Sequence, residues 1–264
     1  MIFRYLNRKT KIMFRSIPLL ILSLLFFNTA QAQVVGGNES KLFNLFILEK
    51  YEDVYYKAFN LSEKEKYAYN AEVHLYIVMS LQKIAENPDL EEAYPNAFKD
   101  ILKYGAKFVK SVAKAEKKEL ETVTIEDNYE YLQELKEYIL EEIYFIFVET
   151  KYSKAASLYR KGLKIFPDDE NILFMAGISE VMSNNRQGQL KLDEFQTKAK
   201  EKYSNSSYEG DEVSNLYFGK TIKTYTDYLV TNGEGTEAKK WIEMAYKFQP
   251  EDETIEAQYE KLMN

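Results

Sequence analysis

The chain has 264 residues, a formal net charge of −7 and no cysteine. This length is enough for one or two domains with a hydrophobic core, and the absence of cysteine excludes disulfides and thiolate metal sites. With only 10 glycines and 5 prolines, the composition favours long helices over many short strands. We therefore expect an all-α protein.

Residues 1–32 have the layout of a cleavable secretory signal. Basic residues between Arg4 and Arg15 precede an apolar run from Ile17 to Phe27, and the small residue Ala32 marks the expected cleavage site. The apolar run is short for a membrane span. An uncleaved N-terminal anchor is the alternative, and a start at Met13 would leave a signal of more usual length.

Cleavage after Ala32 would remove five basic residues and no acidic one, which changes the net charge from −7 to about −12. We expect an acidic protein exported to the periplasm or secreted. Such a protein is a poor match for nucleic acid, whose phosphates require basic contacts, and for anionic membrane surfaces. No membrane span is expected after signal cleavage.

Residues 33–38 form a short glycine-containing linker, and a divergent helical region is expected over residues 39–126. Apolar residues at helical spacing predict one helix over 40–59. Ser62 is expected to cap a second helix that ends near Glu86, before Pro88. A third helix begins near Ala93 and ends in a charged, solvated segment over 107–121.

Residues 127–150 predict one long helix. Because residues 144–148 are apolar on all sides, this helix is expected to be the most buried of the domain, although a β-strand is an alternative for so short and aromatic a run. Further helices are expected over 153–166, 170–183, 189–203, 213–231, 236–248 and 251–262. A mobile loop is expected over 204–210.

Two segments of this region share one pattern of small residues, a larger central residue and proline at offsets zero, four, seven and twelve. The two sets are Ala155, Tyr159, Gly162 and Pro167, and Ala238, Ile242, Ala245 and Pro250. Offsets of four and seven lie on one helical face, where small residues allow another helix to approach closely. Proline then stops the helix, and the acidic residues that follow it are expected to cap the next one.

This pattern resembles the tetratricopeptide repeat (TPR), a helix-turn-helix unit of about 34 residues. Leu173, Ala176 and Gly177 match the first-helix pattern of that family. The resemblance implies a right-handed stack of antiparallel helix pairs, a TPR-like α-solenoid, over residues 127–264. Because Pro167 and Pro250 are 83 residues apart, the array is expected to be irregular. An ordinary helical hairpin ending in proline is the alternative.

In the TPR family, the first helix of each unit lines a concave groove that binds peptides or partner proteins. The resemblance therefore implies a groove here, with apolar and aromatic residues and a basic patch at one end. Its main residues would be Tyr144, Phe147, Phe174, Ile178, Lys220, Lys223 and Asp227, with Glu137 among the further positions. Such a groove suits an amphipathic or extended segment. The alternative, favoured for Tyr144 and Phe147, is burial against neighbouring helices.

Motifs for catalysis are absent from the sequence, and neither a metal site nor a cofactor is predicted. The single histidine, His74, lies on an apolar helical face and is expected in the core. The acidic pairs Glu91-Glu92 and Glu141-Glu142 are adjacent, so the side chains within each pair diverge on a helix. They are interpreted as solvated helix faces.

We therefore predict an exported, non-catalytic interaction module that binds a protein or peptide. The sequence indicates neither the identity of that partner nor the oligomeric state. One alternative is a helical enzyme or solute-binding protein for an envelope glycan or small molecule, which requires a pocket where two carboxylates face one another. Another is a structural subunit of an envelope assembly.

Overall fold

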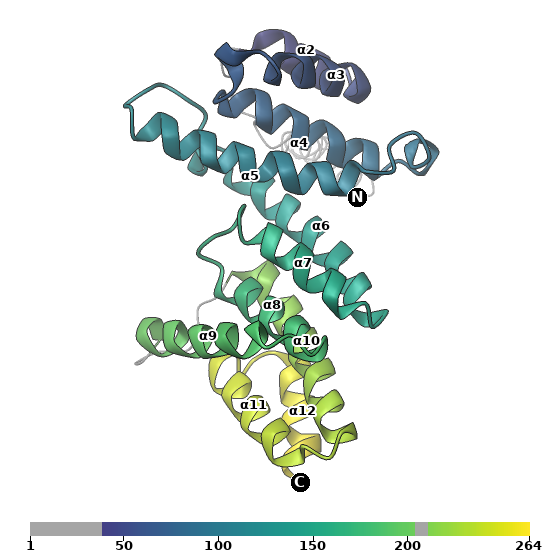
Figure 1. Ribbon diagram of the computed structural model, residues 1–264, viewed down its shortest axis with the longest axis vertical. Helices are drawn as coiled ribbons and strands as arrows, with labels where there is room; N and C mark the ends of the chain where they lie inside the picture. Colours follow the sequence, from purple (N-terminus) through teal and green to yellow (C-terminus); the bar gives the residue numbers. More distant parts are fainter. Residues whose placement is uncertain (1–38, 204–210) are drawn as a thin grey trace, which may run out of the picture. The chain divides into compact units, whose positions relative to one another are not determined.

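The computed structural model describes residues 39–203 and 211–264, except for the side chains of residues 200–203. The predicted signal at 1–32, the linker at 33–38 and the loop at 204–210 lie outside the described residues. Within the described ranges, the protein consists of α-helices and short 3-10 helices and has no strand (Figure 1). The all-α prediction is therefore confirmed, and residues 144–148 are helical.

The helices are named in chain order. The first group consists of α2 (Ser40–Ile47), α3 (Tyr51–Ser62), η1 (Glu65–Tyr67), α4 (Ala71–Ala85), η2 (Pro88–Leu90) and α5 (Ala97–Glu116). The second group consists of η3 (Glu126–Asn128), α6 (Tyr129–Val148), α7 (Tyr152–Gly162), α8 (Glu170–Met182), α9 (Gln187–Tyr203), α10 (Glu212–Thr231), α11 (Gly235–Phe248) and α12 (Glu253–Met263).

Most helices pack against the helix that follows them in the chain, as Figure 1 shows for α4 and α5 and for α11 and α12. Four further contacts join helices that are not consecutive in the sequence. Helix α10 packs against both α6 and α8, and α12 returns to α10. Helix α5 contacts α7, where a Cβ atom added to Gly105 would lie only 2.7 Å from Ile165 Cδ1.

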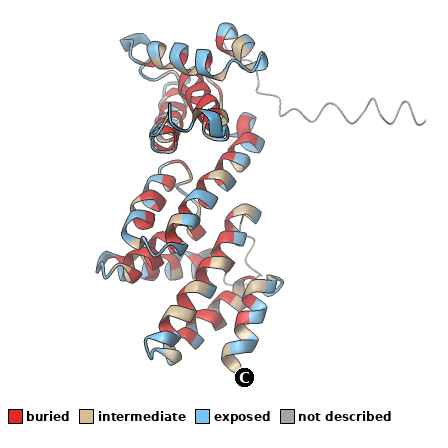
Figure 2. Cartoon of the chain, turned by 90° about the vertical axis from the view of Figure 1, so that its right-hand side faces the viewer, coloured by how far each residue is buried: buried red, intermediate tan, exposed pale blue. Residues whose placement is uncertain are grey.

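The most buried helices are α4 and α8, because each has neighbours on several sides. Helix α4 packs between α3 and α5, and α8 contacts α7, α9 and α10. Nearly every residue of both helices is buried (Figure 2). The prediction that 127–150 is the most buried helix is wrong, since Phe145 is 67% exposed and Val148 is 45% exposed. An apolar run indicates burial only where helices cover all of its faces.

The residues of the repeated pattern lie at helix contacts. Those buried are Ala155, Tyr159, Gly162, Gly177, Ala238, Ile242 and Ala245, whereas Pro167 and Pro250 are exposed beyond the ends of α7 and α11. At Gly177 of α8, an added Cβ atom would lie 2.8 Å from Leu192 Cδ2 of α9. A side chain there would therefore force the Leu192 side chain to move.

Acidic residues after the two prolines cap the following helices, as predicted. The Asp169 carboxylate accepts a hydrogen bond of 3.1 Å from the Ile172 amide, and the Asp252 carboxylate accepts one of 2.9 Å from the Ile255 amide. Each bond satisfies an amide that has no partner within its own helix, and each carboxylate lies at the positive end of the helix dipole.

Two predictions for the first group of helices are wrong. The helix predicted over 40–59 is interrupted, because Glu49 adopts a left-handed backbone with φ of 57° between α2 and α3. Ser62 ends α3 instead of capping a helix, and its hydroxyl donates to the Phe59 carbonyl at 2.8 Å. The cap of α4 is Asn70, whose side chain accepts from the Val73 amide at 2.9 Å.

Two groups of buried ion pairs join helices of the second group. The Lys136 ammonium of α6 lies 3.0 Å from Asp169 and 3.2 Å from Asp211, the residues that cap α8 and α10. The fully buried carboxylate of Glu180 in α8 lies 3.0 Å from Arg160 and 2.8 Å from Lys191. Each central charge thus bonds two partners of opposite sign.

Candidate functional site

Helices α6 and α10 meet at a surface that contains two of the predicted groove residues. The rings of Tyr144 and Tyr217 pack edge to face, with their centroids 5.9 Å apart. The Lys220 ammonium lies 4.7 Å from the centroid of Tyr217 and 5.7 Å from that of Tyr144. The structure therefore brings Tyr144 and Lys220 together, and Lys220 places a positive charge over two electron-rich rings.

A groove adjoins this surface between α6, the start of α10 and the turn before α12. We call it the α10 groove, and its volume is about 1010 Å³. It is lined by Glu137, Glu212, Val213, Asn215, Leu216 and residues 248–252. Leu216 is an apolar side chain that is 45% exposed. The groove thus offers an exposed apolar contact among polar and acidic groups.

Hydrogen bonds fix the wall of the α10 groove. The side-chain oxygen of Asn215 accepts hydrogen bonds from two side-chain amides, from Gln249 Nε2 at 2.9 Å and from Asn171 Nδ2 at 2.8 Å. These bonds join the start of α10 to the turn after α11 and to the start of α8. Glu137 of α6, a groove position implied by the TPR resemblance, also lines the groove.

Three other predicted groove residues belong to the core. Phe147, Phe174 and Ile178 have no exposed surface. The Phe174 ring packs against several aromatic rings, among them Phe218 with a centroid distance of 4.7 Å. A side chain without exposed surface contacts a partner only if the core opens, so the structure does not support a groove at these three positions.

Asp227 fastens α12 to α10, and Lys223 pairs with Asp227 within α10. Their side chains form an ion pair of 3.2 Å, and Asp227 also accepts from Lys261 at 2.7 Å and from Gln258 at 2.9 Å. Asp227 is therefore already bonded to three side chains. The predicted basic patch is reduced to Lys220 and a Lys223 whose charge is partly neutralised.

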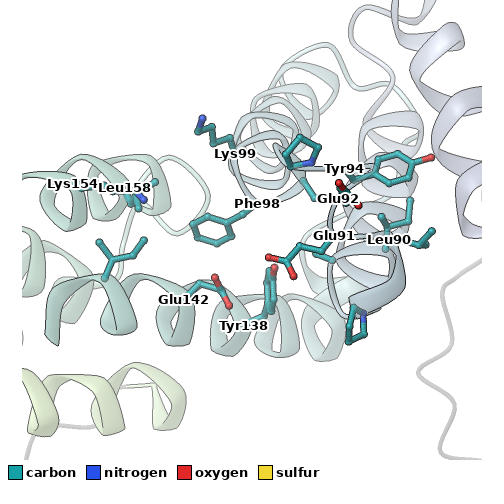
Figure 3. A pocket seen from close by; sticks show the side chains of 16 residues that line it. Leu90, Glu91, Glu92, Tyr94, Phe98, Lys99, Tyr138, Glu142, Lys154 and Leu158 are labelled. Atoms are coloured by element: carbon teal, nitrogen blue, oxygen red, sulfur yellow. The ribbon is translucent and has the colours of Figure 1, made fainter. Parts of the chain in front are cut away.

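A second concave site lies between α5 and α6, and the sequence did not predict it. We call it the α5–α6 cleft, and its volume is about 980 Å³. Figure 3 shows Phe98 of α5, Tyr138 and Glu142 of α6, and Glu91 from the segment after η2 directed into it. The rings of Phe98 and Tyr138 pack edge to face with their centroids 6.0 Å apart.

Negative charge accumulates in the α5–α6 cleft. The pKa of Glu142 is raised, first because the carboxylate is partly desolvated, and then because of the negative charges of Glu141 and Glu91. The pKa of Tyr138 is raised well above its usual value by burial and by the charges of Glu142 and Glu86. Its phenol therefore stays protonated throughout the physiological range.

Sequence reasoning missed this cleft because its parts come from distant segments. Glu91 and Glu142 were each interpreted as one member of a solvated acidic pair, and that interpretation considered only neighbours in the chain. Nothing in the helical periodicity indicates that residues 51 positions apart share a cleft. Their meeting depends on how α5 and α6 are joined.

His74 lies in the core, as predicted. Its side chain is 1% exposed, and its Nδ1 atom is 3.1 Å from the Ser111 hydroxyl oxygen. Burial, and after it the positive charge of Lys107, lowers the His74 pKa to about 4. Within residues 39–203 and 211–264, no three His, Asp or Glu side chains are grouped so that they could hold a metal ion.

No protein-family model, curated protein or solved structure matches this chain significantly. In the part of the chain that the structure describes, none of the helices has the length and apolar character needed to cross a membrane.

Proposed function

We propose that residues 127–264 form a divergent TPR-like array and that the protein is an exported, non-catalytic module that binds a partner protein or peptide. In this proposal, α6–α7, α8–α9 and α10–α11 are three antiparallel helix pairs of a right-handed stack, and α12 covers its end. The signal-like residues 1–32 direct the protein to the periplasm or out of the cell.

The turns inside the proposed pairs support the array. Two positions after the ends of α6, α8 and α10, the backbone has a positive φ, at Thr150 (61°), Asn184 (59°) and Gly233 (81°). In each, the next residue donates its amide to a carbonyl five positions back. This left-handed cap reverses the chain within a few residues, as a stacked pair requires. Two pairs lie between the two prolines, so their spacing of 83 residues exceeds two units of about 34 residues and the proposed array is irregular.

The observation that carries the binding proposal is the position of the α10 groove. It runs between Glu137 and Leu216, which belong to the first helices of two proposed units. First helices line the partner groove in the TPR family. Apolar Leu216 among acidic and amide groups suits an extended segment, because its backbone can bond the polar walls while one side chain contacts Leu216.

Variants of the exposed groove residues test this proposal. We expect Leu216→Glu to abolish capture of a partner by chemical crosslinking in the exporting cell, because it places a charge at the apolar contact. Leu190→Glu on α9 is the matched control, since Leu190 is 61% exposed and does not line the groove. If Leu216→Glu captures the partner as well as the wild type does, the α10 groove is not the binding site.

The α5–α6 cleft favours one alternative function, that of a helical enzyme or solute-binding protein for an envelope glycan. It brings Glu91 and Glu142 together, and it raises the pKa of Glu142 through desolvation and like charges. Most glycoside hydrolases use a pair of carboxyl groups, one of which acts as a general acid with a raised pKa. Incubation with peptidoglycan fragments tests this alternative. Turnover that Glu142→Gln abolishes and Glu134→Gln preserves would establish an enzyme and overturn the non-catalytic proposal.

A further inference from the structure

The carboxylates of the α5–α6 cleft lack a cationic partner. Among the described residues, no hydrogen bond or ion pair joins the side chain of Glu91 or Glu142 to a basic group. Two lysines, Lys99 and Lys154, also line the cleft, and among the described residues neither forms an ion pair with these carboxylates. The Lys99 ammonium donates to the Asn96 side chain at 3.2 Å instead.

Aromatic rings complete the surroundings of these carboxylates. Phe98 and Tyr138 lie beside Glu91 and Glu142 in Figure 3, and the two rings contact each other edge to face at 6.0 Å. An aromatic face attracts a cation, and a carboxylate forms short, charge-assisted hydrogen bonds with ammonium and guanidinium groups. Both kinds of group in this cleft therefore favour the same charge on an occupant.

We propose that the α5–α6 cleft binds a lysine or arginine side chain carried by an extended peptide segment. The cationic head lies between the Glu91 and Glu142 carboxylates, and its aliphatic stem lies along Phe98 and Tyr138. This site is separate from the α10 groove, because the two share no lining residue. It adds a second contact for a partner and defines that contact chemically.

The size and lining of the cleft favour a peptide over a lone small cation. Its volume of about 980 Å³ far exceeds that of one ammonium or guanidinium group. Beyond the carboxylates it continues along Ile146 and Leu158, apolar side chains that can contact the neighbours of a basic residue in a peptide. A free cation would leave that apolar surface uncovered.

Direct binding of a defined peptide tests this proposal. The probe is the fluorescein-labelled peptide Leu-Ala-Lys-Phe-Leu, blocked at its C-terminus, and its control twin carries norleucine in place of lysine. We expect the lysine peptide to bind the purified protein, as measured by fluorescence anisotropy, and the norleucine twin to bind at least about tenfold more weakly, because the charge-assisted bonds are lost.

Protein variants assign the binding to the cleft. Glu142→Gln and Glu91→Gln are each expected to raise the Kd of the lysine peptide about tenfold, because each removes a charged acceptor. Glu134→Gln is the matched control, since it makes the same charge change on the same helix at an exposed residue outside the cleft. Phe98→Leu keeps the site apolar and removes the aromatic face, so a smaller loss is expected.

Several results would overturn the proposal. Equal binding of the two peptides would show an apolar cleft without charge recognition, and an equal loss in Glu134→Gln would show unspecific attraction to an acidic surface. Binding of n-butylammonium as tight as that of the peptide would show a small-cation site, and absence of peptide binding would leave no site. Leu216→Glu is expected to leave this binding unchanged, which separates the test from that of the α10 groove.

Discussion

Helices α2–α5 and helices α6–α9 share one packing order and one type of first turn. In both groups, each helix packs against the next along the chain. The first turn of each group carries the same residues at the same positions, since Phe46 and Tyr51 correspond to Phe147 and Tyr152. The two ring pairs have identical centroid distances of 5.3 Å and interplanar angles of 63° and 62°.

The backbones of these two turns also agree. Lys50 donates its amide to the Leu45 carbonyl at 3.0 Å, and Lys151 donates to the Ile146 carbonyl at 3.2 Å. In each turn the residue before the lysine adopts a left-handed backbone. The two turns are 101 positions apart in the sequence. We therefore propose that the array of helix pairs, itself a proposal for residues 127–264, extends into residues 39–126, where the sequence pattern is weak.

The two groups differ in what they bury. Helices α6–α9 contain Lys136 and Glu180, buried charges that each bond two partners. Helix α4 buries the neutral imidazole of His74, and its one buried carboxylate, Glu72, accepts from the Glu39 backbone amide at 3.0 Å. Buried ion pairs hold the helices in one register, because any shift would leave a buried charge unpaired. A buried neutral histidine instead makes the free energy of unfolding depend on pH. The shared plan is therefore stabilised by different chemistry in the two groups.

Removal of the Lys136 charge is expected to have the largest effect on stability. Lys136→Met leaves Asp169 and Asp211 facing one another without a cation, so we expect the free energy of unfolding to fall by about 3–5 kcal/mol. Urea unfolding followed by circular dichroism measures this loss. Lys223→Met is the matched control, since its ion pair is exposed and its loss is expected to cost about 1 kcal/mol or less. Equal effects would show that the buried group contributes no more than a surface pair.

Low pH is expected to destabilise helices α2–α5 through protonation of His74. Its pKa is lowered from 6.5 to about 4, so the folded state binds a proton less readily than the unfolded chain. The contribution of the neutral imidazole is complete above pH 6.5 and is lost as the pH falls towards 4, at a total cost of about 3 kcal/mol.

The variant His74→Gln isolates this effect from the titration of carboxylates. Below pH 6.5, its free energy of unfolding is expected to fall less steeply with decreasing pH than that of the wild type, as measured by urea unfolding between pH 7 and pH 4. Parallel slopes in the two proteins would show that His74 does not titrate differently in the folded and unfolded states.

Much of the helical architecture could be predicted from local patterns, and most of the site could not. Ala155, Tyr159 and Gly162 indicated a buried helical face because their spacing is a property of one helix. Phe174 was assigned to a groove because nothing in the sequence shows that α10 and α11 cover it. Glu91 and Glu142 meet only through packing between helices that are distant in the chain.

One turn, between α2 and α3, was not predicted, and for a local reason. A left-handed residue after a helix is usually glycine, as at Gly233, but Glu49 and Thr150 occupy the same position in other turns. Without glycine the sequence contains no stop signal, so α2 and α3 were predicted as one helix. Residue preference thus misleads where tertiary contacts impose the turn.

The smallest expected effect tests whether these turns are equivalent. Thr150 is exposed and β-branched, and its φ of 61° is unfavourable for such a residue. Thr150→Gly relieves this strain but gives the unfolded chain more freedom. We therefore expect a net gain of about 0.5–1 kcal/mol in the free energy of unfolding, measured with urea.

Gly233→Ala introduces the same strain at φ of 81° and is expected to lower the free energy of unfolding by about 1 kcal/mol. Because Glu49 is not β-branched, Glu49→Gly should stabilise less than Thr150→Gly. A loss of stability in Thr150→Gly would mean that the threonine side chain supports its turn, and the two turns would then be alike in backbone only.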